Sequence, residues 1–187
     1  MTRPGRRDVS ASTVPCPSPA AMSRLTQQYE TDGFYGIGVL NSERETNVGT
    51  LWRSAFILGA AFIFTIGRKV EKQSSDVTRA WTKIPLFHYA SFDEFRENLP
   101  FATKLVGVEM TPAAEPLVSF EHPTRAVYLL GCESTGLPEP VIAACHSLVV
   151  LPGHFSLNVA VAGSLVACDR VNKLKVRLPE RIFPDEV

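Results

Sequence analysis

The sequence predicts an α/β domain with a mostly parallel sheet flanked by helices. Short apolar runs that suit buried strands alternate along the chain with segments of helical pattern, and this alternation is typical of a parallel sheet. The length of 187 residues suits one domain. Apolar residues make up 45% and charged residues 20% of the chain, which excludes a chain too polar to fold.

In the first half of the predicted domain, two strands enclose a helix. The apolar run 36–40 predicts a strand that ends in the polar loop 41–46. Residues 47–59 have a helical pattern, in which Asn47 is suited to cap the first turn and Gly59 to end the helix. The run 60–66 is apolar and aromatic, as expected of a buried parallel strand.

The second half continues the alternation. Ser91 and Glu94 have the spacing of a capping box, which predicts a helix up to Leu99. Pro138 suits the first turn of a helix that runs to about Cys145. Residues 157–171 predict a final helix that is apolar on nearly every side. Three further strands are expected, over residues 104–109, 126–130 and 148–151.

The N-terminal segment differs in composition from the rest. Residues 1–23 are rich in proline and serine and carry three arginines, so we expect a disordered arm, followed by a single domain over residues 24–187. A basic RNA-contacting tail, a targeting segment and a natural start at Met22 remain open for this arm.

Charge, hydropathy and cysteine content narrow the class of protein. The formal net charge is zero, so any binding of nucleic acid must use a local basic patch. The longest apolar run, 55–66, is too short to span a membrane. The four cysteines form no CxxC pair and no zinc-like spacing with histidine, so we expect no metal. Cys145 and Cys168 are interpreted as small core residues of a cytoplasmic protein in a reducing environment.

Three polar segments interrupt the apolar pattern: Asn47-Val48-Gly49-Thr50-Leu51-Trp52-Arg53, Gly131-Cys132-Glu133-Ser134-Thr135-Gly136 and Ser156-Leu157-Asn158-Val159-Ala160-Val161-Ala162. Each follows a predicted strand directly or after a short loop. Ligands of parallel sheets bind at the carboxyl ends of the strands, so the three segments are expected to form one site. Taken singly, the first two are also compatible with a capped helix and a glycine turn.

In their order and residues, the three segments resemble the motifs of the SpoU/TrmH family, the ribose 2'-O-methyltransferases of the SPOUT class. The resemblance covers roughly residues 36–169. It implies a SPOUT-type domain with a C-terminal trefoil knot, S-adenosylmethionine as the methyl donor and RNA as the substrate. It also implies a homodimer with its active site at or near the subunit interface.

The resemblance implies roles for the polar residues. Arg53 would engage the target ribose hydroxyl, with Asn47 as its positioning partner and Glu133 orienting Arg53 or a backbone amide. Arginine is a poor base at its usual pKa, so an RNA phosphate or Glu133 would help to accept the proton. Ser156 and Asn158 are also assigned to catalysis.

The resemblance likewise implies a set of residues around the methyl donor. The last segment would wrap the adenosine, with backbone groups reading the base edge. Ala160 stands where the family often has a second serine, so no hydroxyl is assigned there. The donor-binding residues are expected to be Val108, Gly131, Leu151, Ser156 and Leu157.

Several alternatives remain at this level. The chain has no room for the extra RNA-binding domain of many family members, which favours tRNA over rRNA as the substrate. A non-catalytic RNA-binding protein with the same fold is the main competitor. A Rossmann-type dehydrogenase is disfavoured because no G-x-G-x-x-G follows a strand, and a hydrolase using Ser156 because no nucleophile elbow surrounds it. Candidate phosphate contacts are Arg44, Arg68, Lys69, Arg79, Lys83, Lys173, Lys175 and Arg177.

Overall fold

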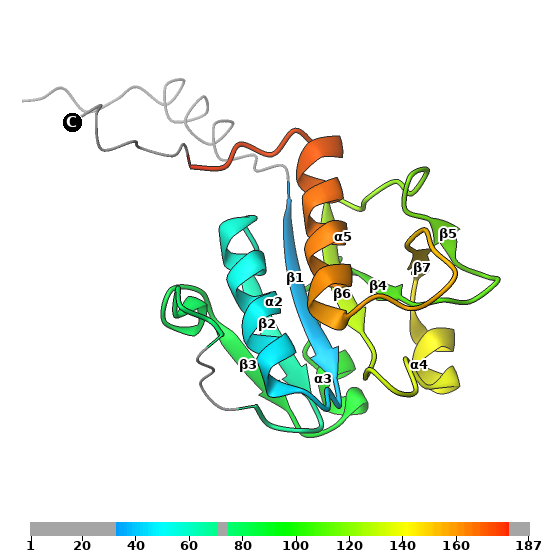
Figure 1. The fold of residues 1–187 in the computed structure, drawn as a ribbon, viewed down its shortest axis with the longest axis horizontal. Coiled ribbons are helices and arrows are strands. Elements are labelled where there is room, and N and C mark those ends of the chain that lie inside the picture. The colour runs from blue at the N-terminus through cyan, green and yellow to red at the C-terminus, as the bar shows by residue number, and fades with distance from the viewer. Residues whose placement is uncertain (1–32, 71–74, 180–187) are drawn as a thin grey trace, which may run out of the picture. The chain divides into compact units, whose positions relative to one another are not determined.

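A computed structural model describes residues 33–70 and 75–179, and these residues form a seven-stranded sheet with helices on both faces (Figure 1). The strand order is β3-β2-β1-β6-β4-β7-β5, and every pair of neighbours is parallel. The predicted parallel α/β fold is therefore confirmed. The strands are β1 Phe34–Leu40, β2 Phe62–Ile66, β3 Leu86–Tyr89, β4 Lys104–Val108, β5 Glu115–Pro116, β6 Arg125–Leu130 and β7 Ser147–Val150.

The helices divide into two layers. Helices α2 (Glu45–Ile57) and α5 (Val159–Lys173) lie next to each other on one face of the sheet (Figure 1). The short helices α3 (Phe92–Glu97) and α4 (Glu139–Ala144) contribute to a second apolar cluster, and a 3-10 turn, η1, spans Ala80–Thr82. Alternate residues of the strands enter the two clusters, as the period of two in a strand requires: Ile37 faces α2 and α5, whereas Leu40 belongs to the other cluster.

Close contact between α2 and α5 depends on a glycine in the last helix. A Cβ atom at Gly163 would lie 2.4 Å from Cδ1 of Leu51, a fully buried residue of α2. The absence of a side chain at Gly163 thus lets the two backbones approach. This contact holds the start of α2 beside the start of α5, which matters for the site described below.

The predicted cap of α2 is wrong. The helix begins at Glu45, with Arg44 at the N-cap position and no side chain capping it. Asn47 lies within the first turn, and its Nδ2 donates a hydrogen bond of 2.7 Å to Glu133 Oε1 instead. The predicted end is close to the observed one, because Gly59 adopts a positive φ of 80° just after the C-cap residue Leu58.

Two other predicted helix starts lie at side-chain caps, whereas Pro138 is the N-cap residue of α4, just before its first turn, and no side chain caps that helix. Ser91 Oγ accepts a hydrogen bond of 3.2 Å from the Glu94 amide, and the Glu94 carboxylate accepts one of 2.6 Å from the amide of Ala90. The last helix begins at Val159 rather than at residue 157, because Asn158 caps it through Oδ1 and the amides of Ala160 and Val161.

Some features differ from the sequence-based expectation. Strands β3 and β5 were not predicted. They are short, lie at the two edges of the sheet and have mostly exposed residues, although β3 (Leu86–Tyr89) is largely apolar and aromatic. Cys168 is exposed and not part of the core, which corrects its interpretation. Cys145 is half-buried, and burial raises the pKa of its thiol to about 11.

Two expectations lie beyond what the fold tests. The predicted arm over residues 1–23 lies outside the described residues. The trefoil knot implied by the resemblance stays a prediction. Within residues 33–70 and 75–179, no helix is long and apolar enough to cross a bilayer.

Candidate functional site

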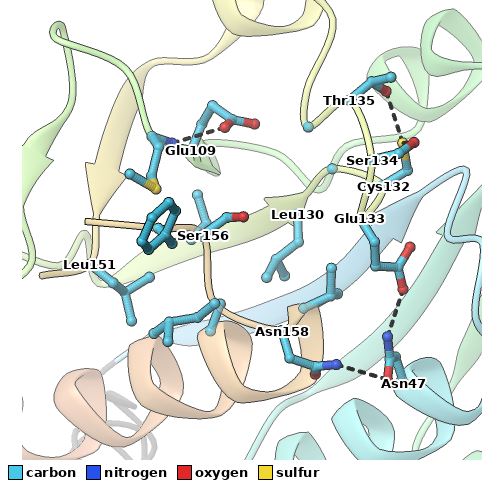
Figure 2. A pocket seen from close by; sticks show the side chains of 18 of the residues that line it. Asn47, Glu109, Leu130, Cys132, Glu133, Ser134, Thr135, Leu151, Ser156 and Asn158 are labelled. Atoms are coloured by element: carbon cyan, nitrogen blue, oxygen red, sulfur yellow. Dashed lines mark hydrogen bonds between the residues drawn. The ribbon is translucent and has the colours of Figure 1, made fainter. Parts of the chain in front are cut away.

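One cavity lies at the carboxyl ends of three adjacent strands. Strands β6, β4 and β7 are neighbours in the sheet, so the segments that follow them meet at one edge. These segments, together with the start of α2 and the start of α5, line a cavity of about 580 Å³ (Figure 2). The three polar sequence segments, separated by up to about a hundred residues, thus converge on one place.

Most of the predicted site residues line this cavity, and one does not. Arg53 lies on an exposed face of α2, outside the cavity lining, and makes no hydrogen bond or ion pair with the rest of the described chain. The other predicted residues are all part of the lining: Asn47, Val108, Gly131, Glu133, Leu151, Ser156, Leu157 and Asn158.

Glu133 is the centre of a hydrogen-bond network between the first two segments. Its Oε1 accepts from Ser42 Oγ at 3.1 Å and from Asn47 Nδ2 at 2.7 Å, and its Oε2 accepts from the Glu43 amide at 2.9 Å. Partial burial opposes ionisation, but these donors hold the pKa of Glu133 below its usual value. Glu133 is therefore an ionised, well-anchored carboxylate that binds the loop after β1.

A second link joins the first and third segments. Asn158 Nδ2 donates to Asn47 Oδ1 at 3.0 Å (Figure 2). Asn158 Oδ1 accepts from the amides of Ala160 and Val161. These hydrogen bonds form a series from the backbone amides of α5 through Asn158 and Asn47 to Glu133. A carboxylate only accepts and a backbone amide only donates, so the two ends of the series fix the orientation of both asparagine amides. The start of α5, the start of α2 and the loop after β6 are thereby held as one unit.

The glycines of the second segment close a loop. Gly136 has a φ of 66°, and its amide donates to the Cys132 carbonyl at 3.0 Å. A Cβ atom at Gly131 would lie 2.1 Å from the carbonyl carbon of Gly136. The loop can therefore fold back on itself only with glycine at residue 131.

The same loop carries a thiol into the cavity lining. Cys132 Sγ lies 2.9 Å from Thr135 Oγ1, and hydrogen bonding to Thr135 lowers the pKa of the thiol. In the described part of the chain, no group of three or more His, Cys, Asp and Glu residues is arranged to hold a metal ion.

Sequence reasoning missed several lining residues. Glu109 follows β4 directly, and its carboxylate accepts hydrogen bonds from the amides of Met110 and Leu137 at 2.9 Å and 2.6 Å. Arg44, the N-cap residue of α2, also lines the cavity. Neither belongs to a recognisable motif; Arg44 was noted only for its charge, and Glu109 only as the end of a predicted strand. The cavity also includes Leu130, Met110 and Phe155.

The lining suits a small molecule with both apolar and polar parts. Leu130, Leu151 and Leu157 offer apolar surface, whereas Glu109 and Ser156 offer hydrogen-bonding groups. The volume lies within the range of about 300–1,000 Å³ that is typical of small-molecule sites. S-adenosylmethionine combines a flat purine with hydroxyl, ammonium and carboxylate groups, so the residues present fit this donor.

Comparisons with known proteins agree with the geometry. The model of the SpoU rRNA Methylase family matches residues 37–168. A tRNA (cytidine(34)-2'-O)-methyltransferase of Beijerinckia indica subsp. indica is 33% identical over 131 residues, which cover 64% of this chain and 79% of that protein. A second enzyme of the same name, from Ancylobacter novellus, is 36% identical over 81 residues, or 42% of this chain and 51% of that protein.

Solved structures show the same fold. A structure described as giving insights into the 2-OH methylation of C/U34 on tRNA matches with a TM-score of 0.66 and 27% identity, covering 79% of this chain and all of that one. An AdoMet-bound rRNA methyltransferase from Sinorhizobium meliloti matches with a TM-score of 0.67 and 22% identity, covering 77% of this chain and 58% of that one. At this identity the second likeness concerns the fold alone.

Proposed function

The chain belongs to the SpoU rRNA methylase family, and from this premise we propose that it methylates the ribose 2'-hydroxyl of nucleotide 34 in tRNA. Membership confirms the predicted family, the predicted class of RNA ribose 2'-O-methyltransferase and the predicted donor, S-adenosylmethionine. The observation that carries the proposal is the convergence of all three motif segments on one cavity.

The choice of tRNA rests on the more similar relatives. Both curated relatives are tRNA 2'-O-methyltransferases that act on cytidine 34, and a solved structure at 27% identity concerns the same nucleotide. The rRNA methyltransferase from Sinorhizobium meliloti is only 22% identical and supports the fold without supporting an rRNA substrate. We therefore favour tRNA over the rRNA alternative.

The residues around the cavity divide into two groups in this proposal. Val108, Gly131, Leu151 and Leu157 surround the adenosine part of the donor, and Ser156 lies beside them. When bound, the donor supplies an electrophilic methyl group on its sulfonium. The amide chain of Asn47 and Asn158 with Glu133 fixes the wall that faces the incoming ribose. Much of the rate would come from this alignment of the two reactants.

The proton of the ribose hydroxyl needs an acceptor outside this network. The Glu133 carboxylate already accepts three hydrogen bonds from the protein, so its oxygens are largely occupied. Arg53 lies on the outer face of α2, away from the cavity of its own chain. We propose that Arg53 engages the target ribose in the active site of a partner subunit, where an RNA phosphate helps to relay the hydroxyl proton to solvent.

An exposed apolar face supports such a homodimer. Val161 and Leu165 on α5 are 48% and 44% exposed, and Ile57 on α2 is 51% exposed. Val161 and Leu165 are four residues apart and share one side of α5, as Arg53 and Ile57 share one side of α2. The two helices lie side by side (Figure 1), so their outer sides form one surface that includes Arg53. We propose that this surface pairs with its copy, and that the enzyme meets its tRNA in the cytoplasm.

The test is transfer of labelled methyl from S-adenosylmethionine to tRNA. We expect wild-type protein to label the 2'-oxygen of nucleotide 34, which nuclease mapping would locate. Arg53→Ala should remove at least about 99% of the transfer while leaving cofactor binding and the unfolding temperature unchanged. Label on a base, or on rRNA alone, would overturn the substrate assignment. Binding of tRNA without any transfer would support the non-catalytic alternative.

A further inference from the structure

Glu109 is a cavity residue that none of the three motif segments contains. It follows β4, and β4 lies between β6 and β7 in the sheet. Glu109 is therefore placed between Gly131, which follows β6, and Leu151, which follows β7, and its carboxylate contacts the amide of Leu137. These two residues flank the proposed place of the adenosine, so Glu109 borders it.

The carboxylate of Glu109 is held firmly and keeps capacity for a ligand. Oε1 accepts from the Met110 amide at 2.9 Å and Oε2 accepts from the Leu137 amide at 2.6 Å (Figure 2 shows the first). Each carboxylate oxygen has two lone pairs, so one acceptor site on each oxygen is left over. Within the described residues, Glu109 forms no ion pair with Lys or Arg.

The other carboxylate of the cavity differs in this respect. Glu133 accepts three hydrogen bonds from Ser42, Glu43 and Asn47, all of which belong to the protein. Of the two carboxylates that line the cavity, Glu109 thus has the greater remaining capacity to accept hydrogen bonds from a ligand.

We propose that Glu109 binds the vicinal ribose hydroxyls of the methyl donor through its two carboxylate oxygens. Two neighbouring oxygens match two neighbouring hydroxyl donors, and an acidic residue after a parallel strand binds ribose in the same manner in dinucleotide sites. The apolar residues Val108, Leu130 and Leu151 beside it suit the adenine ring. This inference rests on the proposed function and adds a residue that selects a ribonucleoside donor.

The proposal is tested by measuring the affinity for the product S-adenosylhomocysteine by calorimetry. The wild-type protein is measured before the variants. Removal of the 2'- or the 3'-hydroxyl from this ligand should weaken binding about tenfold, because a hydrogen bond to a charged group is lost. Glu109→Gln should weaken binding of the intact ligand about tenfold or more, and the two deoxy ligands should lose little further in this variant. Glu115→Gln, which removes a charge from an exposed residue of β5 outside the lining, should bind like wild type.

Three outcomes would overturn the inference. The wild-type protein could bind the deoxy ligands as tightly as the intact one. Glu109→Gln could weaken the binding of the intact and deoxy ligands by the same factor. Glu109 would then only position the turn that contains Leu137. Glu109→Gln could also weaken the binding of S-adenosylhomocysteine but not that of 5'-methylthioadenosine, which has the ribose but no amino acid. Glu109 would then bind the ammonium group. Failure of the wild type to bind any of these ligands would instead count against the proposed function.

Discussion

The amide groups of Asn47 and Asn158 form a chain with only one allowed direction. The amides of Ala160 and Val161 donate at one end, and the carboxylate of Glu133 accepts at the other. Each asparagine therefore uses its oxygen toward α5 and its nitrogen toward Glu133. The chemistry of asparagine, with a donor and an acceptor on one side chain, is required at both positions, which aspartate cannot supply.

Asn158→Asp tests this direction. The new carboxylate still caps α5, but its second oxygen meets Oδ1 of Asn47, and Asn47 cannot turn over without aiming that oxygen at Glu133. Asn158 is exposed and Asn47 partly buried, so we expect the free energy of unfolding to fall by about 0.5–1.5 kcal/mol, the net contribution of one hydrogen bond, in urea titrations at neutral pH.

A compensating change makes the test specific. Glu133→Gln offers an amide nitrogen to a reversed Asn47, while its oxygen still accepts from the Glu43 amide. The double variant Asn158→Asp with Glu133→Gln should therefore be more stable than Asn158→Asp alone. Strictly additive losses in the double variant would contradict the proposed direction of the chain.

At the scale of elements, helix α5 is anchored at both ends by side-chain hydrogen bonds. Asn158 holds its first turn at the cavity, and Arg170 holds its last turns at the opposite end of the sheet. Arg170 is 2% exposed and donates to the carbonyls of Pro123, Thr124 and Phe34, at the starts of β6 and β1. Among the described residues Arg170 forms no ion pair with a carboxylate, so these carbonyls stabilise the buried cation.

A histidine network joins the same region. His122 Nε2 donates to Asp169 at 2.8 Å, so the neutral ring accepts through Nδ1 from the Tyr128 hydroxyl at 2.6 Å. Lys173 pairs with Asp169, and Arg170 donates to the Tyr128 oxygen. Burial raises the pKa of Tyr128 to about 12, and it lowers the pKa of His122 although the Asp169 hydrogen bond acts in the opposite direction.

The lowered pKa of His122 predicts a loss of stability in mild acid. The unfolded chain binds a proton near the ordinary histidine pKa of about 6.5, whereas the folded protein binds it only at lower pH. The stabilisation by neutral His122 is thus fully present above the pKa of histidine in the unfolded chain. It is lost as the pH falls toward the pKa of His122 in the folded protein. The free energy of unfolding should fall by at most about 1.4 kcal/mol per pH unit in this window. His122→Gln should have a smaller slope between about pH 7.5 and 5.5 in urea titrations; an equal slope would exclude His122 as the cause.

The elements that sequence patterns predicted are those with strong local signals. The buried strands β1, β2, β4, β6 and β7 contain apolar runs, and α3 begins with a capping pair three residues apart. Asn47 looked like a helix cap because caps are usually local, yet its partner Glu133 lies 86 residues away. The edge strand β3 has only 4 residues directly after Pro85, so its apolar residues Leu86 and Phe87 did not stand out as a strand, and both are exposed in the fold.

At the scale of the whole molecule, the order of the segments and the parallel topology were enough to predict one site. Because neighbouring parallel strands end at the same edge, motifs after β6 and β7 had to meet there. Glu109 could not be predicted to take part, since a single carboxylate after a strand has many ordinary explanations. The position of Arg53 outside its own cavity could not be predicted either, because it depends on which face of α2 packs on the sheet.

Mixing of two inactive variants tests whether Arg53 serves the partner subunit. Arg53→Ala leaves the donor cavity intact, whereas Ser156→Trp fills the cavity from an exposed position and leaves Arg53 intact. Each variant alone should transfer almost no methyl to tRNA. If Arg53 acts across the interface, a mixed dimer holds one complete site, and subunit exchange should restore up to about a quarter of the wild-type rate, since about half of the dimers are mixed. Arg53→Ala mixed with a double variant that carries both changes provides the matched control and should stay inactive. No recovery in the first mixture, although mixed dimers are detected by mass spectrometry, would mean that Arg53 acts in its own chain.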